Sequence, residues 1–189
     1  MIKYAICGNI ASGKSEVEKI LLNLGYKVLD TDKVAHELLK EKSDEIINEF
    51  KGFDICEKNG EISRKKLAKI VFFDKKMKEK LEKILHPLIK IRIAKYFADN
   101  EKEEKVFVAV PLLFECGMEN LFDKIIFIYT KDRIRLERLI LRDNYSGEIA
   151  KIRMDSQIPQ DEKVKKSDIV VYNNSSLEDL EREIKALVL

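Results

Sequence analysis

The 189-residue sequence predicts a three-layer α/β fold around a five-stranded parallel sheet. Five short segments are rich in β-branched and aromatic residues, and several are apolar throughout, which is typical of strands buried on both faces. Helical patterns separate them, as expected of a wound α/β domain. One interval of about 75 residues is too long for a simple crossover and predicts an inserted helical lobe. The predicted strands are Lys3–Cys7, Lys27–Asp30, Val106–Val110, Lys124–Tyr129 and Ile169–Tyr172.

The first predicted strand leads straight into a phosphate-binding loop. Residues 8–15 read Gly-Asn-Ile-Ala-Ser-Gly-Lys-Ser and fit the pattern G-x-x-x-x-G-K-[ST] without a mismatch. Apolar residues at helical spacing follow, so the strand–loop–helix context is the one that the pattern requires. The glycines let backbone N–H groups converge on phosphate oxygens at the positive end of the helix. Lys14 adds a charge for the β- and γ-phosphates, and the Ser15 hydroxyl can ligate Mg²⁺. We therefore expect a nucleoside-triphosphate site.

Two carboxylates follow the second predicted strand, in the sequence Asp30-Thr31-Asp32. Side chains at the carboxyl edge of a parallel sheet face the ligand crevice, here beside the phosphate loop. A carboxylate at this place can orient or deprotonate an attacking hydroxyl, or hold Mg²⁺ through water. These residues could instead only cap the next helix, but capping needs just one of them. We expect a role in the chemistry.

The long interval before the third strand predicts several helices. Ser63 can cap one of them and Asp74 can cap the next. Pro87 falls within an otherwise continuous helical period, where a proline removes a hydrogen-bond donor and clashes with the preceding turn, yet it is tolerated at a first helical position. We therefore expect one helix to end at His86 and another to begin at Pro87. On spacing alone, His86 is best explained as a helix cap.

The third predicted strand is followed by Val110–Glu115, which reads VPLLFE. Many phosphate-loop enzymes carry an acidic residue at the very end of this strand, where it holds Mg²⁺. None stands there in this sequence, so a conventional Walker B carboxylate is missing or displaced.

The fourth predicted strand is followed by an arginine-rich helix over Arg133–Arg142 and a mixed-charge helix over 146–157. Arg138 and Arg142 are four residues apart and share one helical face. The cluster could be a solvated surface. A flap that closes over ATP is the sharper interpretation, because an enzyme that transfers a phosphoryl group must exclude water.

The last predicted helix opens with a possible capping box of Ser175 and Glu178. The elements together predict a core, an inserted lobe and a lid. Their expected ranges are 1–30, 104–132 and 159–189 for the core, 31–103 for the lobe and 133–158 for the lid.

The composition excludes several functions. The 36 basic and 34 acidic residues give a net charge of +2, which argues against a surface for nucleic acid. Cys7, Cys56 and Cys116 show no metal-ligand spacing and no disulfide framework, and Cys7 is expected to be a small buried hydrophobe. No secretory signal is evident, and no apolar stretch approaches the length of a membrane span. We expect a cytoplasmic monomer that binds no membrane.

Several short motifs occur in a specific order along nearly the whole chain, although each one outside the phosphate loop is weak by itself. They are the loop at 8–15, Leu29–Asp32 with Ala35-His36, then Arg64, Leu67, Val71-Phe72 and Asp74, then Leu81-Glu82 and His86–Ile89, VPLLFE, Arg138 with Arg142-Asp143, Ser156-Gln157, and Asn173-Asn174. In these motifs the chain resembles the dephospho-coenzyme A kinase family. That family is similar to nucleoside-monophosphate kinases, with a five-stranded parallel core, a helical acceptor-binding lobe and a small lid.

The resemblance implies a transfer from ATP, with Mg²⁺, to the 3′-hydroxyl of dephospho-coenzyme A. It implies that Asp32 is the base for that hydroxyl, that Lys14 binds the phosphates, and that Arg138 and Arg142 belong to the lid; we expect these four to be the catalytic residues. The expected ATP-binding residues are Gly8, Ala11, Ser12, Gly13, Lys14, Ser15, Glu16 and Asn173. The expected acceptor-binding residues are Asp32, Arg64, His86, Lys90, Leu112 and Glu115.

Five residues depart from the family pattern. Asn9, Ala11 and Glu16 stand where the family usually has glycine, glycine and threonine. Lys90 replaces an arginine and so keeps the charge but loses bidentate geometry, and Arg135 replaces a glutamine in the lid. We expect Ala11 to be tolerated only with ordinary backbone dihedrals.

Two rival functions fit the phosphate loop less well. Another small-molecule kinase, for a nucleotide or a sugar acid, does not account for Asp30 and Asp32 together with His86-Pro87 and VPLLFE. A GTP-dependent switch would need an N-K-x-D guanine-binding motif and a D-x-x-G switch motif, and the sequence contains neither.

Overall fold

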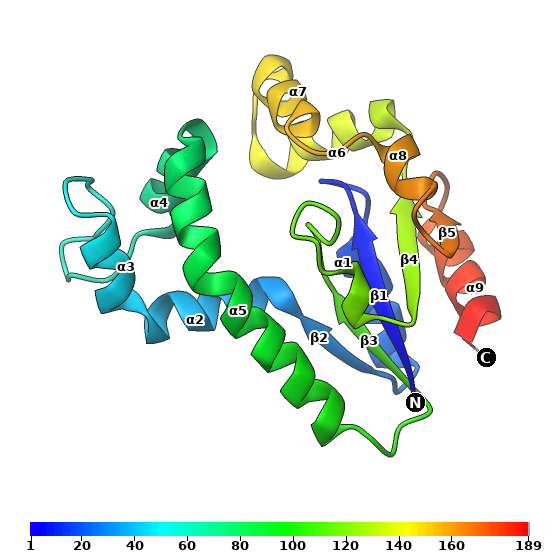
Figure 1. Cartoon of the computed structure of the whole chain (residues 1–189). Helices are drawn as coiled ribbons and strands as arrows, with labels where there is room; N and C mark the ends of the chain where they lie inside the picture. The colour runs from blue at the N-terminus through cyan, green and yellow to red at the C-terminus, as the bar shows by residue number, and fades with distance from the viewer. Residues whose placement is uncertain (189) are drawn as a thin grey trace. The chain divides into compact units, whose positions relative to one another are not determined.

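A computed structural model describes residues 1–188 and contains a wholly parallel five-stranded sheet (Figure 1), which confirms the predicted fold class. The strand order is β2-β3-β1-β4-β5. Each strand lies within one residue of its predicted bounds. They are β1 Ile2–Gly8, β2 Lys27–Asp30, β3 Lys105–Ala109, β4 Lys124–Tyr129 and β5 Ile169–Tyr172.

Helices connect these strands. The bounds are α1 Lys14–Asn23, α2 Thr31–Glu41, α3 Ser43–Glu49, α4 Arg64–Phe73, α5 Lys75–Asp99, α6 Asp132–Asp143, α7 Gly147–Asp155, α8 Gln160–Val164 and α9 Leu177–Val188, with a short 3₁₀ turn at Glu119–Leu121.

The chain divides into two compact units. The sheet unit contains residues 1–30 and the chain from Phe97 onward, and the helical unit contains Thr31–Tyr96. The helical unit falls within the predicted lobe of residues 31–103. The finer division into core, lobe and lid stays a prediction.

The sheet unit has apolar residues on both faces of its central strands. Residues 106–109 of β3 are inaccessible to solvent, and Ile126–Ile128 of β4 are nearly so. On one face, Ile6, Phe107 and Ile128 form a core with the apolar sides of α1 and α9. Because all strands are parallel, the ends of β1, β4 and β5 meet at one edge of the sheet, and the loops that leave this edge form the candidate site.

Helix α5 runs through Pro87 without a break, so the predicted division at His86-Pro87 is wrong. Leu85, Ile89 and Ile93 are buried at four-residue spacing, and this apolar stripe continues across the proline. Burial of the stripe offsets the hydrogen bond that Pro87 cannot make. His86 therefore lies inside a helix, and its interpretation as a cap is also wrong.

The predicted helix caps are only partly present. Asp74 Oδ1 accepts hydrogen bonds from the backbone N–H of Lys76 and of Met77, as expected of a cap for α5. Ser63 precedes α4, but its side chain makes no capping hydrogen bond. At α9, Ser176 and Asp179 form the capping pair in place of the predicted Ser175 and Glu178, because the helix begins one residue later.

Candidate active site

The phosphate loop joins β1 to α1 and follows the path that its glycines allow. A Cβ added to Gly8 would lie 2.4 Å from Ser12 Oγ, and one added to Gly13 would lie 2.0 Å from Asn173 Nδ2, so neither position has room for a side chain. Gly13 also has a φ of +92°, in the left-handed region that glycine adopts without cost. Both glycines are therefore required by the packing of the loop.

Ala11 has a φ of +62°, so the expectation of ordinary dihedrals at this residue is wrong. The left-handed conformation costs a residue with a Cβ about 1–2 kcal/mol. Such strain persists where the surrounding structure fixes the conformation, and it gathers at functional sites. The neighbours of Ala11 therefore have to hold the loop in place.

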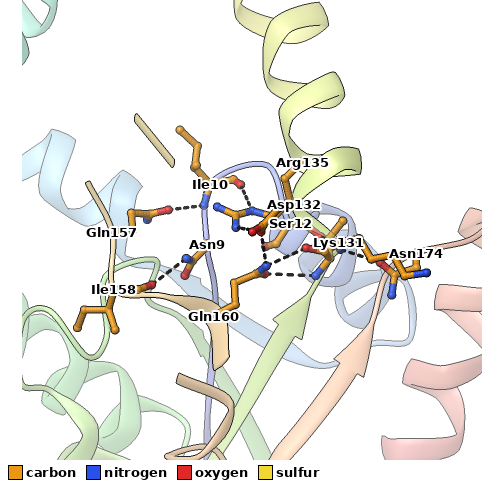
Figure 2. A network of polar contacts seen from close by, with 11 residues as sticks. Asn9, Ile10, Ser12, Lys131, Asp132, Arg135, Gln157, Ile158, Gln160 and Asn174 are labelled. Atoms are coloured by element: carbon orange, nitrogen blue, oxygen red, sulfur yellow. Dashed lines mark hydrogen bonds and ion pairs between the residues drawn. The ribbon is translucent and has the colours of Figure 1, made fainter. Parts of the chain in front are cut away.

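Side chains hold the backbone on both sides of Ala11, and Figure 2 shows those that bond Ile10, before it. The Ile10 N–H donates to Gln157 Oε1 at 2.7 Å, and the Ile10 carbonyl accepts from Arg135 Nε at 3.0 Å. After Ala11, the Ser12 carbonyl accepts from Thr130 Oγ1 at 2.9 Å and from Asn173 Nδ2 at 2.8 Å. The partners come from the loop after β4, from α6, from the segment after α7 and from the end of β5.

Arg135 lies at the centre of this network and is only 3% exposed. Its Nη1 pairs with Asp132 at 2.8 Å, and the same Asp132 oxygen accepts from Gln160 Nε2 (Figure 2). Burial lowers the pKa of Arg135, and the carboxylate of Asp132 opposes that shift. Nη2 is buried and has no hydrogen-bond partner among the described residues. Thus a charged side chain fixes the loop backbone from within the protein.

The predicted triphosphate ligands lie at the start of α1. Lys14 forms an ion pair with Glu18 at 2.6 Å, one turn further along the helix. Ser15 is exposed in the first turn, and Glu16 pairs with Lys19 at 2.8 Å. The N-terminus of α1 adds the positive end of the helix dipole, which favours an anion.

Asn173, a predicted ATP-binding residue, is buried against the loop. Its side-chain amide donates to the Ser12 carbonyl, and its own carbonyl lies 3.2 Å from Thr130 Oγ1, which shares its one hydroxyl proton between this carbonyl and that of Ser12. It therefore shapes the loop backbone.

The other three arginines of α6 differ in their surroundings. Arg138 is half-buried, and its Nη1 lies 3.7 Å from the place that a Cβ on Gly13 would occupy, so its guanidinium lies beside the phosphate loop. Arg142 is exposed and forms a two-pronged pair with Asp143, which raises the pKa of Arg142 and lowers that of Asp143. Arg133 is exposed and bonds Glu137. The structure places Arg138 near the loop and pairs Arg142 elsewhere.

Glu115, at the end of VPLLFE, forms a buried ion pair. Its Oε1 accepts from Lys163 Nζ at 2.6 Å and from the Ile158 N–H at 3.3 Å, and Lys163 is 1% exposed. Glu115 thus holds the segment between α7 and α8. Leu112, the other predicted acceptor ligand of this loop, is exposed. Cys7 is buried as predicted, and burial raises its thiol pKa to about 12.

The other predicted acceptor ligands lie in the helical unit. Asp32 is exposed in the first turn of α2, Arg64 is the exposed first residue of α4, and Lys90 is exposed on α5. His86 is half-buried one turn before Lys90. Burial lowers the pKa of His86, Lys90 and Lys78 lower it further, and Glu82 opposes them.

Sequence reasoning missed Thr130, Gln160 and Lys163, and it named Arg135 only as a departure from the family pattern. No motif marks the first three, because their partners lie far away in the sequence. Gln157 belonged to a quoted motif, but nothing in the sequence indicated its bond to Ile10.

The strand, the glycine-bounded loop with its lysine and serine, and the arginine-bearing helix beside it define a phosphate-loop kinase. A sequence profile described as dephospho-CoA kinase matches residues 2–179. The chain belongs to the dephospho-CoA kinase family, and the resemblance seen in the sequence is confirmed.

Individual relatives match over nearly the full chain. The dephospho-CoA kinase of Fusobacterium nucleatum is 42% identical over 182 residues, which is 95% of this chain and 93% of that protein. The solved dephospho-CoA kinase of Campylobacter jejuni is 38% identical with a TM-score of 0.73, covering 98% of this chain and 94% of that one. The TT1252 structure from Thermus thermophilus is 34% identical with a TM-score of 0.88, covering 99% and 96%. A shikimate kinase from Bacteroides thetaiotaomicron, 13% identical with a TM-score of 0.54 and covering 98% and 96%, shares the fold alone.

Proposed function

We propose that this chain transfers the γ-phosphate of ATP to the ribose 3′-hydroxyl of dephospho-CoA, giving CoA and ADP. The observation that carries the proposal is a complete, internally braced phosphate loop in a chain of the dephospho-CoA kinase family. The rival, a nucleotide or sugar-acid kinase, has no comparable support, because the shikimate kinase shares only the fold.

In the proposed mechanism, the loop binds the β- and γ-phosphates through its backbone N–H groups and Lys14. Phosphate would draw Lys14 away from Glu18, its partner one turn along α1. Arg138, beside Gly13, would neutralise charge that develops on the transferred group. Arg142 would have to leave Asp143 to take part, so it is the weaker candidate.

The donor set fits Mg²⁺. The hydroxyl of Ser15 is a hard oxygen ligand, exposed next to Lys14, and Mg²⁺ commonly binds through one or two protein oxygens together with substrate phosphates and water. Residues 1–188 contain no cluster of three or more His, Cys, Asp or Glu side chains that could hold a metal. Ser15 would therefore be the protein ligand, and the ion would neutralise charge on the phosphates.

Asp32 is proposed as the general base. It lies in the first turn of α2, two residues after the end of β2. Its carboxylate would accept the proton of the 3′-hydroxyl as that oxygen bonds to the γ-phosphorus. The bond between the γ-phosphorus and the bridging oxygen breaks, and ADP leaves with the electron pair. Arg64, His86 and Lys90 would bind the acceptor, while Glu115 is occupied by Lys163 and is proposed to shape the site rather than touch the acceptor.

We further propose that the enzyme acts as a monomer in the cytoplasm. Cys7 and Cys56 are free thiols, as is usual in a reducing compartment. Within residues 1–188, no helix is long and apolar enough to cross a membrane. Light scattering coupled to gel filtration tests the oligomeric state.

The reaction is tested by following ADP release from ATP and Mg²⁺ with one acceptor at a time. Dephospho-CoA should be the preferred acceptor, and CoA itself, whose 3′-hydroxyl is already phosphorylated, should be inactive. Shikimate, gluconate and nucleoside monophosphates serve as rival acceptors. Preference for any of these over dephospho-CoA would overturn the proposal.

A further inference from the structure

The residue before the strained Ala11 is held at both of its backbone groups. The Ile10 N–H is bound by Gln157 and the Ile10 carbonyl by Arg135, so the peptide planes on either side of Ile10 are fixed (Figure 2). On the other side of Ala11, Thr130 and Asn173 share the Ser12 carbonyl. A left-handed residue with a Cβ remains in place only under such constraint.

The two partners of Ile10 lie at opposite ends of one continuous segment, residues 135–157. Arg135 lies in the first turns of α6, and Gln157 lies two residues after the end of α7. Helices α6 and α7 between them are the predicted lid. The phosphate loop is therefore tied to the point where this segment begins and to the point where it returns.

Further bonds fix both partners. Arg135 pairs with Asp132, which also binds Gln160 of α8. Next to Gln157, Ile158 donates to Glu115 and accepts from Asn9 Nδ2 at 3.0 Å. Since the guanidinium is buried, its bond to a carbonyl lies in a medium of low dielectric and is strengthened there.

We propose that Arg135 and Gln157 are positioning residues that hold the phosphate loop in the left-handed conformation at Ala11, in which it binds ATP, and so connect the loop to both ends of the α6–α7 segment. Neither side chain needs to touch the nucleotide. The inference rests on the proposed function only in taking ATP as the ligand of the loop.

The test is a double-mutant cycle with Ala11→Gly. Glycine adopts a positive φ without strain, so a loop with Ala11→Gly keeps its shape when the hydrogen bond from Gln157 or Arg135 to Ile10 is lost. In the natural chain, Gln157→Ala should raise the dissociation constant for ATP with Mg²⁺ by about 5- to 30-fold, the equivalent of the cost of a left-handed residue. In the Ala11→Gly chain, the same substitution should raise it by no more than about two-fold, the usual error of additivity. Arg135→Met should behave in the same way.

Arg133→Met is the matched control, because Arg133 lies on the same helix but is exposed and pairs with Glu137, away from the loop backbone. It should leave ATP affinity unchanged in both chains. Equal losses from Gln157→Ala in the presence and absence of Ala11→Gly would overturn the proposal, since a merely structural role predicts additive effects. Gln157 is only partly buried, so the Gln157→Ala variant keeps the test valid if Arg135→Met does not fold.

Urea unfolding without nucleotide separates this proposal from the proposed function. Ala11→Gly should stabilise the natural chain more than it stabilises the Gln157→Ala chain, because only the braced loop carries the strain. If that difference appears but the natural chain does not bind ATP, the proposed function is wrong, and the positioning role of Arg135 and Gln157 is supported. If ATP binds but the effects on both affinity and stability are additive, the proposed positioning role is wrong.

Discussion

The two units of the molecule differ in the kinds of contact that stabilise each of them internally. In the sheet unit, polar side chains are buried in and around the phosphate loop. They are Asn9, Ser12, Thr130, Arg135, Gln160 and Asn173, with Lys163 nearby. Among them, Thr130, Arg135 and Asn173 bond the loop backbone. In the helical unit, buried apolar residues such as Leu38, Ile46 and Ile93 form the packed interior. Its helices also carry ion pairs between them, Arg92 with Glu41 and Lys80 with Glu49, and these pairs are exposed.

The phosphate loop is therefore preorganised by hydrogen bonds, whereas the helical unit is stabilised mainly by apolar packing. Each buried hydrogen bond contributes about 0.5–1.5 kcal/mol and also fixes a direction, because an unpaired buried group is costly. Exposed ion pairs contribute about 0–1 kcal/mol and fix little. Substitutions around the loop should therefore alter nucleotide binding and chemistry, whereas most substitutions in the helical unit should alter stability. Asp32 and the proposed acceptor ligands Arg64, His86 and Lys90 are the expected exceptions, and the first prediction tests Asp32.

The largest effects should come from Lys14 and Asp32, one in each unit, and they should differ in kind. Lys14→Ala should weaken ATP binding and reduce turnover by at least about 10²–10³-fold, because it removes a charge aimed at the reacting phosphates. Asp32→Asn should reduce turnover by about 10²–10⁴-fold, the usual contribution of a positioned base, and leave ATP affinity nearly unchanged. Steady-state kinetics and calorimetric titration with ATP measure the two quantities.

Asp30→Asn is the control for Asp32. Equal loss of turnover in both variants, together with weaker binding of Mg²⁺, would favour a shared role in holding the metal. Normal turnover in Asp32→Asn would rule out the base, and normal turnover in Lys14→Ala would contradict the assignment of the phosphate loop.

An effect within the same range is expected at α6. Arg138→Ala should lower turnover by about 10³-fold, the low end for an arginine that stabilises the transferred phosphoryl group, because its guanidinium already lies beside Gly13. Arg142→Ala should have less effect, because its partner is Asp143, and Arg133→Ala should have the least. Thermal unfolding of each variant checks that the fold is intact. Three variants with near-normal turnover would show that α6 is a solvated surface and not part of a lid.

The sequence predicted local features better than contacts between distant segments. The five strands and the loop at 8–15 depend on runs of neighbouring residues, and all were located to within a residue. The hydrogen bonds of Ile10 join residue 10 to residues 135 and 157, so no local pattern could reveal them. The left-handed Ala11 was missed for the same reason, since its conformation is imposed by those distant partners.

At Pro87 a local pattern gave the wrong prediction. A proline favours the end of a helix, but burial of the apolar stripe of α5 keeps this helix continuous across Pro87.

That proline gives the next prediction, on stability in the helical unit. Pro87→Ala should raise the free energy of unfolding by about 1–3 kcal/mol, because it restores an N–H donor and removes a clash inside α5. Urea unfolding measures the change. Pro159→Ala is the matched control, since Pro159 immediately precedes α8, where a proline fits, and its loss should not stabilise the chain. A destabilised Pro87→Ala variant would indicate that the packing of α5 depends on a proline-induced bend.

The smallest expected effect is a pH dependence that arises from His86 in the helical unit. Burial lowers the pKa of His86 below its ordinary value of 6.5, Lys90 and Lys78 act in the same direction, and Glu82 opposes them. Between the folded-state pKa and about 6.5, the unfolded chain binds more protons at this site than the folded chain does. The stability contributed by neutral His86 is therefore present above about pH 6.5 and is lost as the pH falls toward the folded-state pKa.

His86→Gln should remove this part of the pH dependence, so the natural chain should lose more stability than the variant between about pH 7.5 and 5.5. His36→Gln, on α2, is the control and should retain the His86 contribution. Equal losses in the natural chain and in His86→Gln would show that burial does not hold this histidine neutral.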